Sequence, residues 1–163
     1  MIILVADSSV LIDLERGNLL EVALSGPDVL AAPDFLYEAE IRDNGGPELL
    51  RLGLQIIELD AAEMTASQVL VNNQNAMSLP DCTAYICSRR PAHELLTNDR
   101  PLRTYAEANG VPCHGVLWLL DRLHDTGTTS ADVLHEGLSR IAAHRRCRLP
   151  RNEIAIRLRR WRP

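Results

Sequence analysis

The sequence predicts a three-layer α/β/α domain with a mainly parallel sheet, plus a helical C-terminal extension. Short apolar runs alternate along the chain with longer segments of helical periodicity, which is typical of a parallel sheet covered by helices on both faces. The first run, residues 2–6, is apolar at every position, as expected of a strand that is buried on both faces. The 163 residues, 46% hydrophobic and 24% charged, suit one globular domain rather than a disordered or fibrous chain.

Capping and breaking residues indicate where the elements of the first half begin and end. Asp7 closes the first strand, and the two serines after it can cap a helix that runs to Gly17. A second helix over residues 18–24 ends before Gly26, which is followed by proline. The other elements expected in this half are a strand over 29–31, a helix that Pro33 or Asp34 opens and that runs to Ile41, a strand over 54–59 and a helix over 61–72.

Similar signals delimit the second half. Pro80 suits the first turn of a helix, Gly110 suits the end of another, and Pro150 separates the last two helices. The elements expected here are helices over 79–90, 102–109 and 115–124, strands over 95–97 and 111–113, and two polar helices over about 130–144 and 150–161. We therefore predict a domain over residues 1–126 and a basic helical extension over 127–163 that is not an independent domain.

All 17 basic residues are arginine, and the absence of lysine excludes several classes of enzyme. P-loop NTPases place a lysine on the phosphates, protein kinases need a lysine on a strand, and Schiff-base enzymes need a lysine amine. Receiver domains and haloacid-dehalogenase-type phosphatases combine an acidic pocket with an essential lysine, so they are disfavoured for the same reason.

Charge is distributed unevenly along the chain. Residues 1–139 hold 21 acidic and 8 basic residues, a balance of −13, whereas residues 140–163 hold nine arginines and one glutamate, a balance of +8. Such a tail either contacts a phosphate backbone or docks on the acidic body or on a second subunit. The apolar residues that would anchor a docked tail are Ile141, Ile154, Ile156, Leu158 and Trp161.

Cysteine usage and the lack of export signals predict a cytoplasmic location. The four cysteines, at positions 82, 87, 113 and 147, form no C-x-x-C pair, which disfavours a zinc site or a thioredoxin motif. No apolar run approaches the ~20 residues of a membrane span, and no basic segment precedes the first apolar run. We therefore expect reduced thiols and no membrane association.

Acidic residues stand where a parallel sheet would bring them together. Asp7 and Asp99 each follow a strand, Asp81 lies in the first turn of a helix, and Glu38 and Glu40 lie on the helix after the second strand. If the first strand pairs with the strand 95–97, these groups converge at the carboxyl ends of the strands, where α/β ligand sites lie. Carboxylates in one cleft repel one another and require a cation, and oxygen ligands without His or Cys select Mg²⁺ or Mn²⁺. Each acid alone is also compatible with a helix cap or a solvated side chain.

Four short motifs occur in a recognisable order. Residues 5–13 read Val-Ala-Asp-Ser-Ser-Val-Leu-Ile-Asp, residues 78–81 read Ser-Leu-Pro-Asp with Ala84 after them, and residues 95–100 read Leu-Leu-Thr-Asn-Asp-Arg. Residues 115–120, Gly-Val-Leu-Trp-Leu-Leu, complete the set. Together they resemble the PIN-domain ribonucleases, especially the VapC-type toxins of toxin–antitoxin pairs. The resemblance runs from Met1 to about Leu123 and implies a PIN-like fold.

The resemblance also implies roles for individual residues. The family's three metal-holding aspartates correspond to Asp7, Asp81 and Asp99, with Ser9, Thr97 and Asn98 beside them. The family's glutamate corresponds to Glu38 if Ala32 caps the helix and to Glu40 if Asp34 does; we favour Glu40, because an apolar residue follows it. Asp13 belongs to the opening motif but points away from Asp7, so it either supports the site from behind or lies on the surface.

The function that the resemblance implies is cleavage of RNA by a Mg²⁺- or Mn²⁺-dependent endoribonuclease, in which a water activated by the metal attacks the phosphodiester. We expect a homodimeric toxin that a cognate antitoxin inhibits. Candidate contacts to the nucleic acid are Arg100, Arg145, Arg146 and Arg148. Two alternatives are a catalytically inactive PIN-fold binding module and a metal-dependent phosphatase or nucleotide hydrolase. The complete acidic set argues against the first, and the missing lysine and phosphate loops argue against the second.

Overall fold

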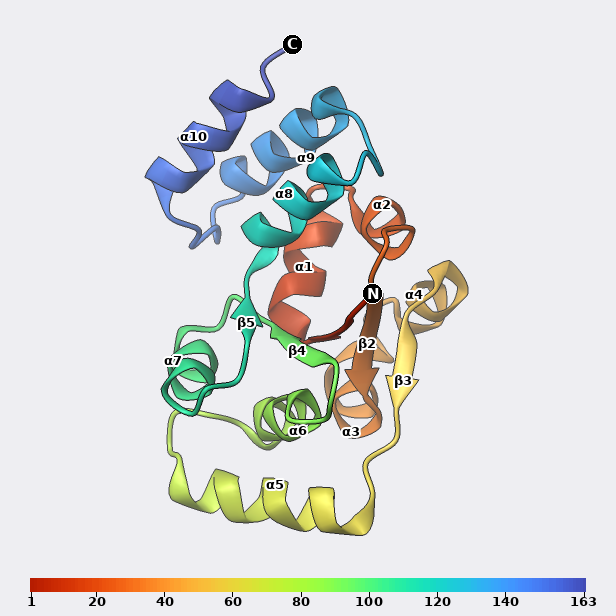
Figure 1. Ribbon diagram of the computed structural model, residues 1–163, viewed down its shortest axis with the longest axis vertical. Coiled ribbons are helices and arrows are strands. Elements are labelled where there is room, and N and C mark those ends of the chain that lie inside the picture. Colours follow the sequence, from red (N-terminus) through yellow and green to blue (C-terminus); the bar gives the residue numbers. More distant parts are fainter.

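The computed structural model describes all residues 1–163 and contains one five-stranded sheet in the order β3-β2-β1-β4-β5 (Figure 1). The strands are β1 (Ile3–Ala6), β2 (Val29–Pro33), β3 (Gln55–Ile57), β4 (His93–Leu96) and β5 (Cys113–His114). Every neighbouring pair of strands is parallel. The continuous apolar run at the start of the chain forms the central strand, in which Leu4, Val5 and Ala6 are fully buried.

Helices cover both faces of the sheet (Figure 1). On one face, α6 (Leu79–Ser88) packs on β1, β2 and β4, and around it lie α3 (Asp34–Leu36), α5 (Ala61–Asn73) and α7 (Arg100–Ala108). The other face carries α1 (Ser8–Arg16), α2 (Leu20–Leu24) and α8 (Val116–Asp125), with α4 (Gly46–Leu52) beside α2. The predicted three-layer α/β/α fold is confirmed, and its sheet is wholly parallel. None of these helices has both the length and the apolar character that crossing a bilayer would need.

The C-terminal extension packs on the body rather than projecting from it. Helix α9 (Ala131–Ala143) lies against α1 and α8, and α10 (Arg151–Arg160) lies against α9. Gly137 permits the close approach of α9, because a Cβ there would stand 2.5 Å from a methyl carbon of Leu19. Ile141, Ile154 and Trp161 belong to the same hydrophobic core as the sheet residues, which confirms docking of the tail at these positions. Ile156 is instead 49% exposed, so its predicted anchoring role is wrong.

Trp161 is the largest fully buried side chain of the protein. We expect Trp161→Ala to lower the free energy of unfolding by about 3–5 kcal/mol, because it leaves a cavity between the tail and the body. For a chain of this size the melting temperature then falls by roughly 6–20 °C. Trp161→Phe is the matched control: it keeps most of the apolar volume and removes an indole N–H that has no hydrogen-bond partner, so it should cost less than about 1.5 kcal/mol. Equal melting temperatures for the alanine variant and the wild type would contradict this packing.

Several element bounds differ from those predicted, and in each case local backbone chemistry explains the difference. The second helix begins at Leu20 rather than residue 18, because Asn18 adopts a left-handed conformation with φ 55°. Helix α4 was not predicted, since Asn44, Gly45 and Gly46 were interpreted as the end of the preceding helix; Gly46 instead begins α4, and Pro47 occupies its first turn, where the missing N–H costs nothing. Strand β5 begins at Cys113 rather than at residue 111, because Pro112 has no N–H to donate to a neighbouring strand.

The order of strands places a ligand-binding edge at the centre of the sheet. The chain leaves β1 toward β2 on one side and later returns to β4 on the other side. The segments that follow β1 and β4 therefore diverge to opposite faces of the sheet, and ligands of α/β proteins bind at such a switch point, outside the carboxyl ends of the strands. Asp7 follows β1 and Thr97 follows β4 at this edge.

Candidate functional site

Asp7 is a buried carboxylate at the end of the central strand. Two hydroxyl groups donate hydrogen bonds to its side chain. Ser9 Oγ donates to Oδ1 at 2.6 Å, and Thr97 Oγ1 donates to Oδ2 at 2.5 Å. The Val10 N–H also donates to Oδ1, which makes Asp7 the N-cap of α1. Only 2% of the residue is exposed, and this burial is the main reason that the pKa of Asp7 rises to about 6; the negative charge of Asp81 adds to the rise.

The two hydroxyls that hold Asp7 are themselves fixed by the backbone after β4. The Asn98 N–H donates to Ser9 Oγ at 3.0 Å, and the Asp99 N–H donates to Thr97 Oγ1 at 2.9 Å. Each hydroxyl therefore accepts one hydrogen bond from the β4–α7 turn and donates one to Asp7. This arrangement ties the ends of β1 and β4 together and fixes the orientation of the carboxylate.

Asn98 extends this network to two further helices. Its Nδ2 donates to Asp13 Oδ2 at 2.7 Å, and its Oδ1 accepts from the Val116 N–H at 3.0 Å. Gly115 leaves room for this contact, since a Cβ there would lie 2.8 Å from Asn98 Oδ1. Asp13 is only 8% exposed. Of its two predicted roles, the structure therefore favours support of the site from behind over a place on the surface. The available sequence signal was its spacing of four residues from Ser9, which places both on one face of α1.

Asp81 and Asp99 lie at the N-termini of two other helices. Asp81 forms a capping box with Ser78, with N–H to oxygen distances of 3.1 and 3.2 Å, and Asp99 accepts from the Leu102 N–H at 3.0 Å as the N-cap of α7. The positive ends of helix dipoles favour carboxylates in these places. Burial raises the pKa of Asp81, and the charges of Asp99 and Glu40 raise it further. These carboxylates therefore influence one another electrostatically across separate elements.

The structure separates Glu38 from Glu40. Glu40 is half-buried, and its Oε2 accepts from Ser8 Oγ at 2.7 Å, beside Asp7. Glu38 is exposed and pairs with Arg42 at 2.8 Å on the outer side of the segment. The predicted helix to Ile41 is present, but its second part, Tyr37–Ile41 (η1), is π-helical, with the Arg42 N–H bonded to the Tyr37 carbonyl five residues back. Counting from an N-cap, as the sequence argument did, assumes a regular α-helix that this segment does not form.

A comparison with known protein families agrees with this geometry. The chain matches the PIN domain family over residues 3–163. The chain belongs to the PIN domain family. The match includes the C-terminal extension, for which the sequence resemblance provided no counterpart. No curated protein and no solved structure gives a significant match. A PIN domain is a nuclease-type fold, and PIN domains are generally nucleases that use divalent metals.

The side chains of this PIN domain suit a hard divalent cation by their chemistry. Asp7, Glu40, Asp81 and Asp99 offer only carboxylate oxygen, the ligand type that Mg²⁺ and Mn²⁺ prefer. As the side chains stand, no three His, Cys, Asp or Glu groups are gathered closely enough to hold one ion. Binding therefore requires the half-buried side chains of Glu40, Asp81 and Asp99 to turn from their present partners toward Asp7.

The arginines that the sequence singled out fall into two places. Arg100 is exposed at the first position of α7, directly after Asp99. Arg145, Arg146 and Arg148 are exposed in the short loop between α9 and α10.

Proposed function

We propose that this PIN domain is a Mg²⁺- or Mn²⁺-dependent endoribonuclease. One observation carries the proposal: acidic residues from four separate segments lie along the carboxyl edge of a parallel sheet, and the charges of neighbouring carboxylates add to the rise in the pKa of Asp7 and Asp81 that burial mainly causes. Helix capping alone would account for Asp7, Asp81 and Asp99 taken one at a time. It does not account for the fact that these three carboxylates and Glu40 lie near enough to influence one another by charge. A bound cation offsets that repulsion.

In this proposal Asp7, Glu40, Asp81 and Asp99 hold the cation. When bound, the cation supplies charge stabilisation at the phosphodiester and lowers the pKa of a water molecule. Ser9 and Thr97 keep the Asp7 carboxylate in one orientation, because each donates to a different oxygen of it. The hydroxyls of Ser8, Ser9 and Thr97 all donate to carboxylates of the site, so we assign them to holding these carboxylates and expect direct hydrolysis by water without a covalent intermediate.

We further propose that the protein is a cytoplasmic, homodimeric toxin that a cognate antitoxin inhibits. The support is the order of the four motifs in the sequence, which is similar to that of the VapC-type toxins. Inducing the chain alone in a bacterial host should arrest growth, and the Asp7→Asn variant should not. Growth arrest by both proteins would show that the arrest does not depend on cleavage and would contradict the toxin assignment.

The decisive assay for the activity uses end-labelled single-stranded RNA with the purified protein and Mg²⁺ or Mn²⁺. We expect internal cuts that give shorter fragments. Hydrolysis of a phosphate monoester without cleavage of RNA would favour the phosphatase alternative. RNA binding without any cleavage would favour the inactive binding module.

The two glutamates give a paired test of the site. We expect Glu40→Gln to lower kcat strongly, because Glu40 accepts a hydrogen bond from Ser8, the residue after Asp7. We expect Glu38→Gln to leave kcat nearly unchanged, because Glu38 pairs with Arg42 in solvent. Both changes remove one negative charge, so each controls for the other. An inactive Glu38→Gln variant together with an active Glu40→Gln variant would reverse the assignment.

A further inference from the structure

The arginines of the C-terminal extension divide into paired and unpaired groups. Arg157 binds Asp121 at 2.6 Å and Glu153 at 2.9 Å, and Arg160 binds Asp125 at 2.7 Å, so these side chains neutralise acidic neighbours on α8 and α10. Arg140 pairs with Glu136 in the same way. The three arginines of the α9–α10 loop have no hydrogen bond or ion pair from their guanidinium groups. Docking of the tail therefore accounts for Arg157 and Arg160 on α10, but it does not account for the charge of this loop.

The loop arginines share a hollow with a residue of the body. Arg145, Arg146, Cys147 and Arg148 line it together with Arg16, at the end of α1, and its volume is about 450 Å³. Arg16 is held there by Asp13 at 3.4 Å. Four arginines thus line one hollow, and three of them have no carboxylate partner, so an anion in the hollow would meet positive charge that the protein does not neutralise. The hollow is thus suited to phosphate.

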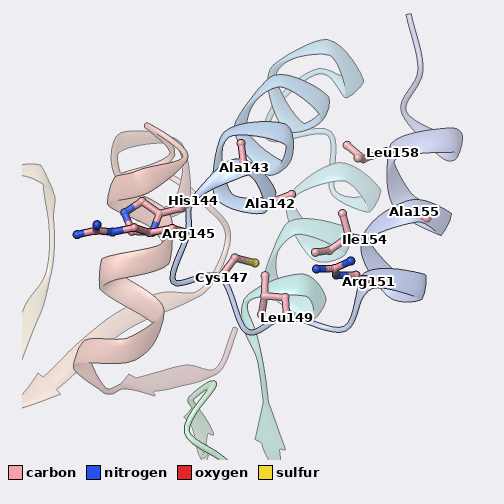
Figure 2. A pocket seen from close by; sticks show the side chains of 10 residues that line it. All are labelled: Ala142, Ala143, His144, Arg145, Cys147, Leu149, Arg151, Ile154, Ala155 and Leu158. Atoms are coloured by element: carbon pink, nitrogen blue, oxygen red, sulfur yellow. The ribbon is translucent and has the colours of Figure 1, made fainter.

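The hollow connects to the carboxylate site along one face of α1. Ser9, Asp13 and Arg16 follow at helical spacing, so this face leads from Asp7 to the loop over about 13 Å. Asp13 connects the two ends, because it binds Asn98, which precedes Asp99, and also binds Arg16. Figure 2 shows His144 and Arg145 extending from the loop toward α1 and away from α10. Burial raises the pKa of Asp13, and the charges of Arg16 and, more weakly, of His144 counteract this rise.

The lining of the hollow favours a nucleic acid over an acidic protein. Protein interfaces rely on apolar and aromatic anchors in their buried centre, and this hollow offers four arginines and one cysteine. The groove between α9 and α10 in Figure 2 is mainly apolar and shares only Arg145 and Cys147 with the hollow. In addition, residues 1–139 carry a balance of −13, so a strand that reaches the carboxylates needs a cationic surface nearby.

We propose that Arg16, Arg145, Arg146 and Arg148 bind the phosphates of the RNA strand whose cleavage site lies at Asp7. The proposal rests on the proposed function, since it makes the hollow part of the path of the substrate. It assigns the basic loop of the extension to binding and the carboxylates of the body to cleavage. The two parts of the chain then hold one strand between them.

The first test measures how salt weakens RNA binding. A triple variant with Arg145, Arg146 and Arg148 changed to alanine is compared with the unchanged loop, both in the Asp7→Asn background so that RNA stays intact. The matched control removes the same charge by changing three other exposed arginines to alanine. These arginines have no ion pair and lie outside the loop: Arg89, Arg159 and Arg162. Each lost phosphate contact removes about 0.7 from the slope of log K against log salt for a single strand, so we expect the loop variant to lose about 2 and the control far less.

The second test uses Cys147 as a reporter inside the hollow. Burial raises the pKa of the other three thiols, to about 11 for Cys82 and about 12 for Cys87 and Cys113, so Cys147 should react fastest with an alkylating reagent. We expect single-stranded RNA to slow the alkylation of Cys147 in the Asp7→Asn protein. The same measurement is made with polyglutamate at an equal concentration of charge. If polyglutamate protects Cys147 as well as RNA does, the hollow would be assigned to an acidic protein and the proposal would be overturned.

The outcomes separate this inference from the proposed function. Cleavage of RNA by the wild type with equal salt slopes for the loop variant and the control variant would overturn the inference and leave the function standing. Failure of the wild type to cleave RNA would contradict the function, whatever the slopes are. Unchanged melting temperatures are expected for both triple variants, because none of the six arginines has an ionic partner to lose.

Discussion

Replacing Asp7 by asparagine should abolish RNA cleavage without unfolding the protein. A ligand to the cation contributes several kcal/mol to the stabilisation of the transition state, so we expect kcat to fall by at least about a thousandfold. Asparagine is as good an N-cap as aspartate, and its Oδ1 can still accept from Ser9, so α1 keeps its start. The rate of cleavage of a labelled RNA checks the first part, and thermal denaturation checks the second. Full activity in this variant would contradict the assignment of Asp7.

The same variant should change how stability depends on pH when no metal is present. The pKa of Asp7 is about 6 in the folded protein and 3.8 in the unfolded reference, so the folded state favours the protonated form. The stability that protonation of Asp7 provides is complete below about pH 4 and is lost as the pH rises to about 6. At about 1.4 kcal/mol for each pKa unit, ionised Asp7 costs on the order of 3 kcal/mol at neutral pH. Asp7→Asn does not titrate, so in EDTA its melting temperature should exceed that of the wild type at pH 7 and approach it at pH 4. A large loss of stability at pH 7 would show a purely structural Asp7.

Removal of divalent cations should eliminate cleavage altogether. We expect exhaustive chelation to stop the reaction, and Mg²⁺ or Mn²⁺ to restore it without any need for Zn²⁺, because the proposed ligands are all carboxylates. A cation at one hundred times its dissociation constant stabilises the folded state by about 2.7 kcal/mol, so the melting temperature should rise by roughly 5–10 °C. The Asp7→Asn protein, which lacks one ligand, is the control and should show a much smaller rise. Activity that survives chelation would contradict metal dependence.

Much of the fold could be predicted because burial imposes simple patterns on the sequence. Residues 2–6 lie in the middle of the sheet, and only an unbroken apolar run suits a strand covered on both faces. The carboxylates at strand ends could be anticipated for a related reason, since parallel strands bring their carboxyl ends to one edge. Helix α4 was missed because glycine and proline interrupt helices in some sequences and occupy the first turn of a helix in others.

Other features depend on contacts that no local pattern records. The π-helical turn at Tyr37–Ile41 changes which glutamate faces Ser8, and no residue in that segment is of a type that predicts a π-helical turn. The bonds from Asn98 to Asp13 and Val116 join segments 85 and 18 residues away, so only the folded chain reveals them. The tail presents a similar case. Its composition allowed both docking and phosphate binding. In the structure Trp161, directly after α10, is buried against the body, whereas the arginines of the preceding loop line the hollow to which we assign phosphate binding by proposal.

Titration of Mn²⁺ into the metal-free protein is the most direct test of the central claim that these carboxylates form one cation site in a PIN nuclease. The three proteins to compare are the wild type, Asp81→Asn and Glu38→Gln. Asparagine at position 81 can still accept from the Ser78 N–H, so α6 keeps its start while the site loses a charge. We predict saturable binding to the wild type and to Glu38→Gln with similar affinity, and strongly weakened binding to Asp81→Asn. Equal binding by all three proteins, or no binding by the wild type, would contradict the account.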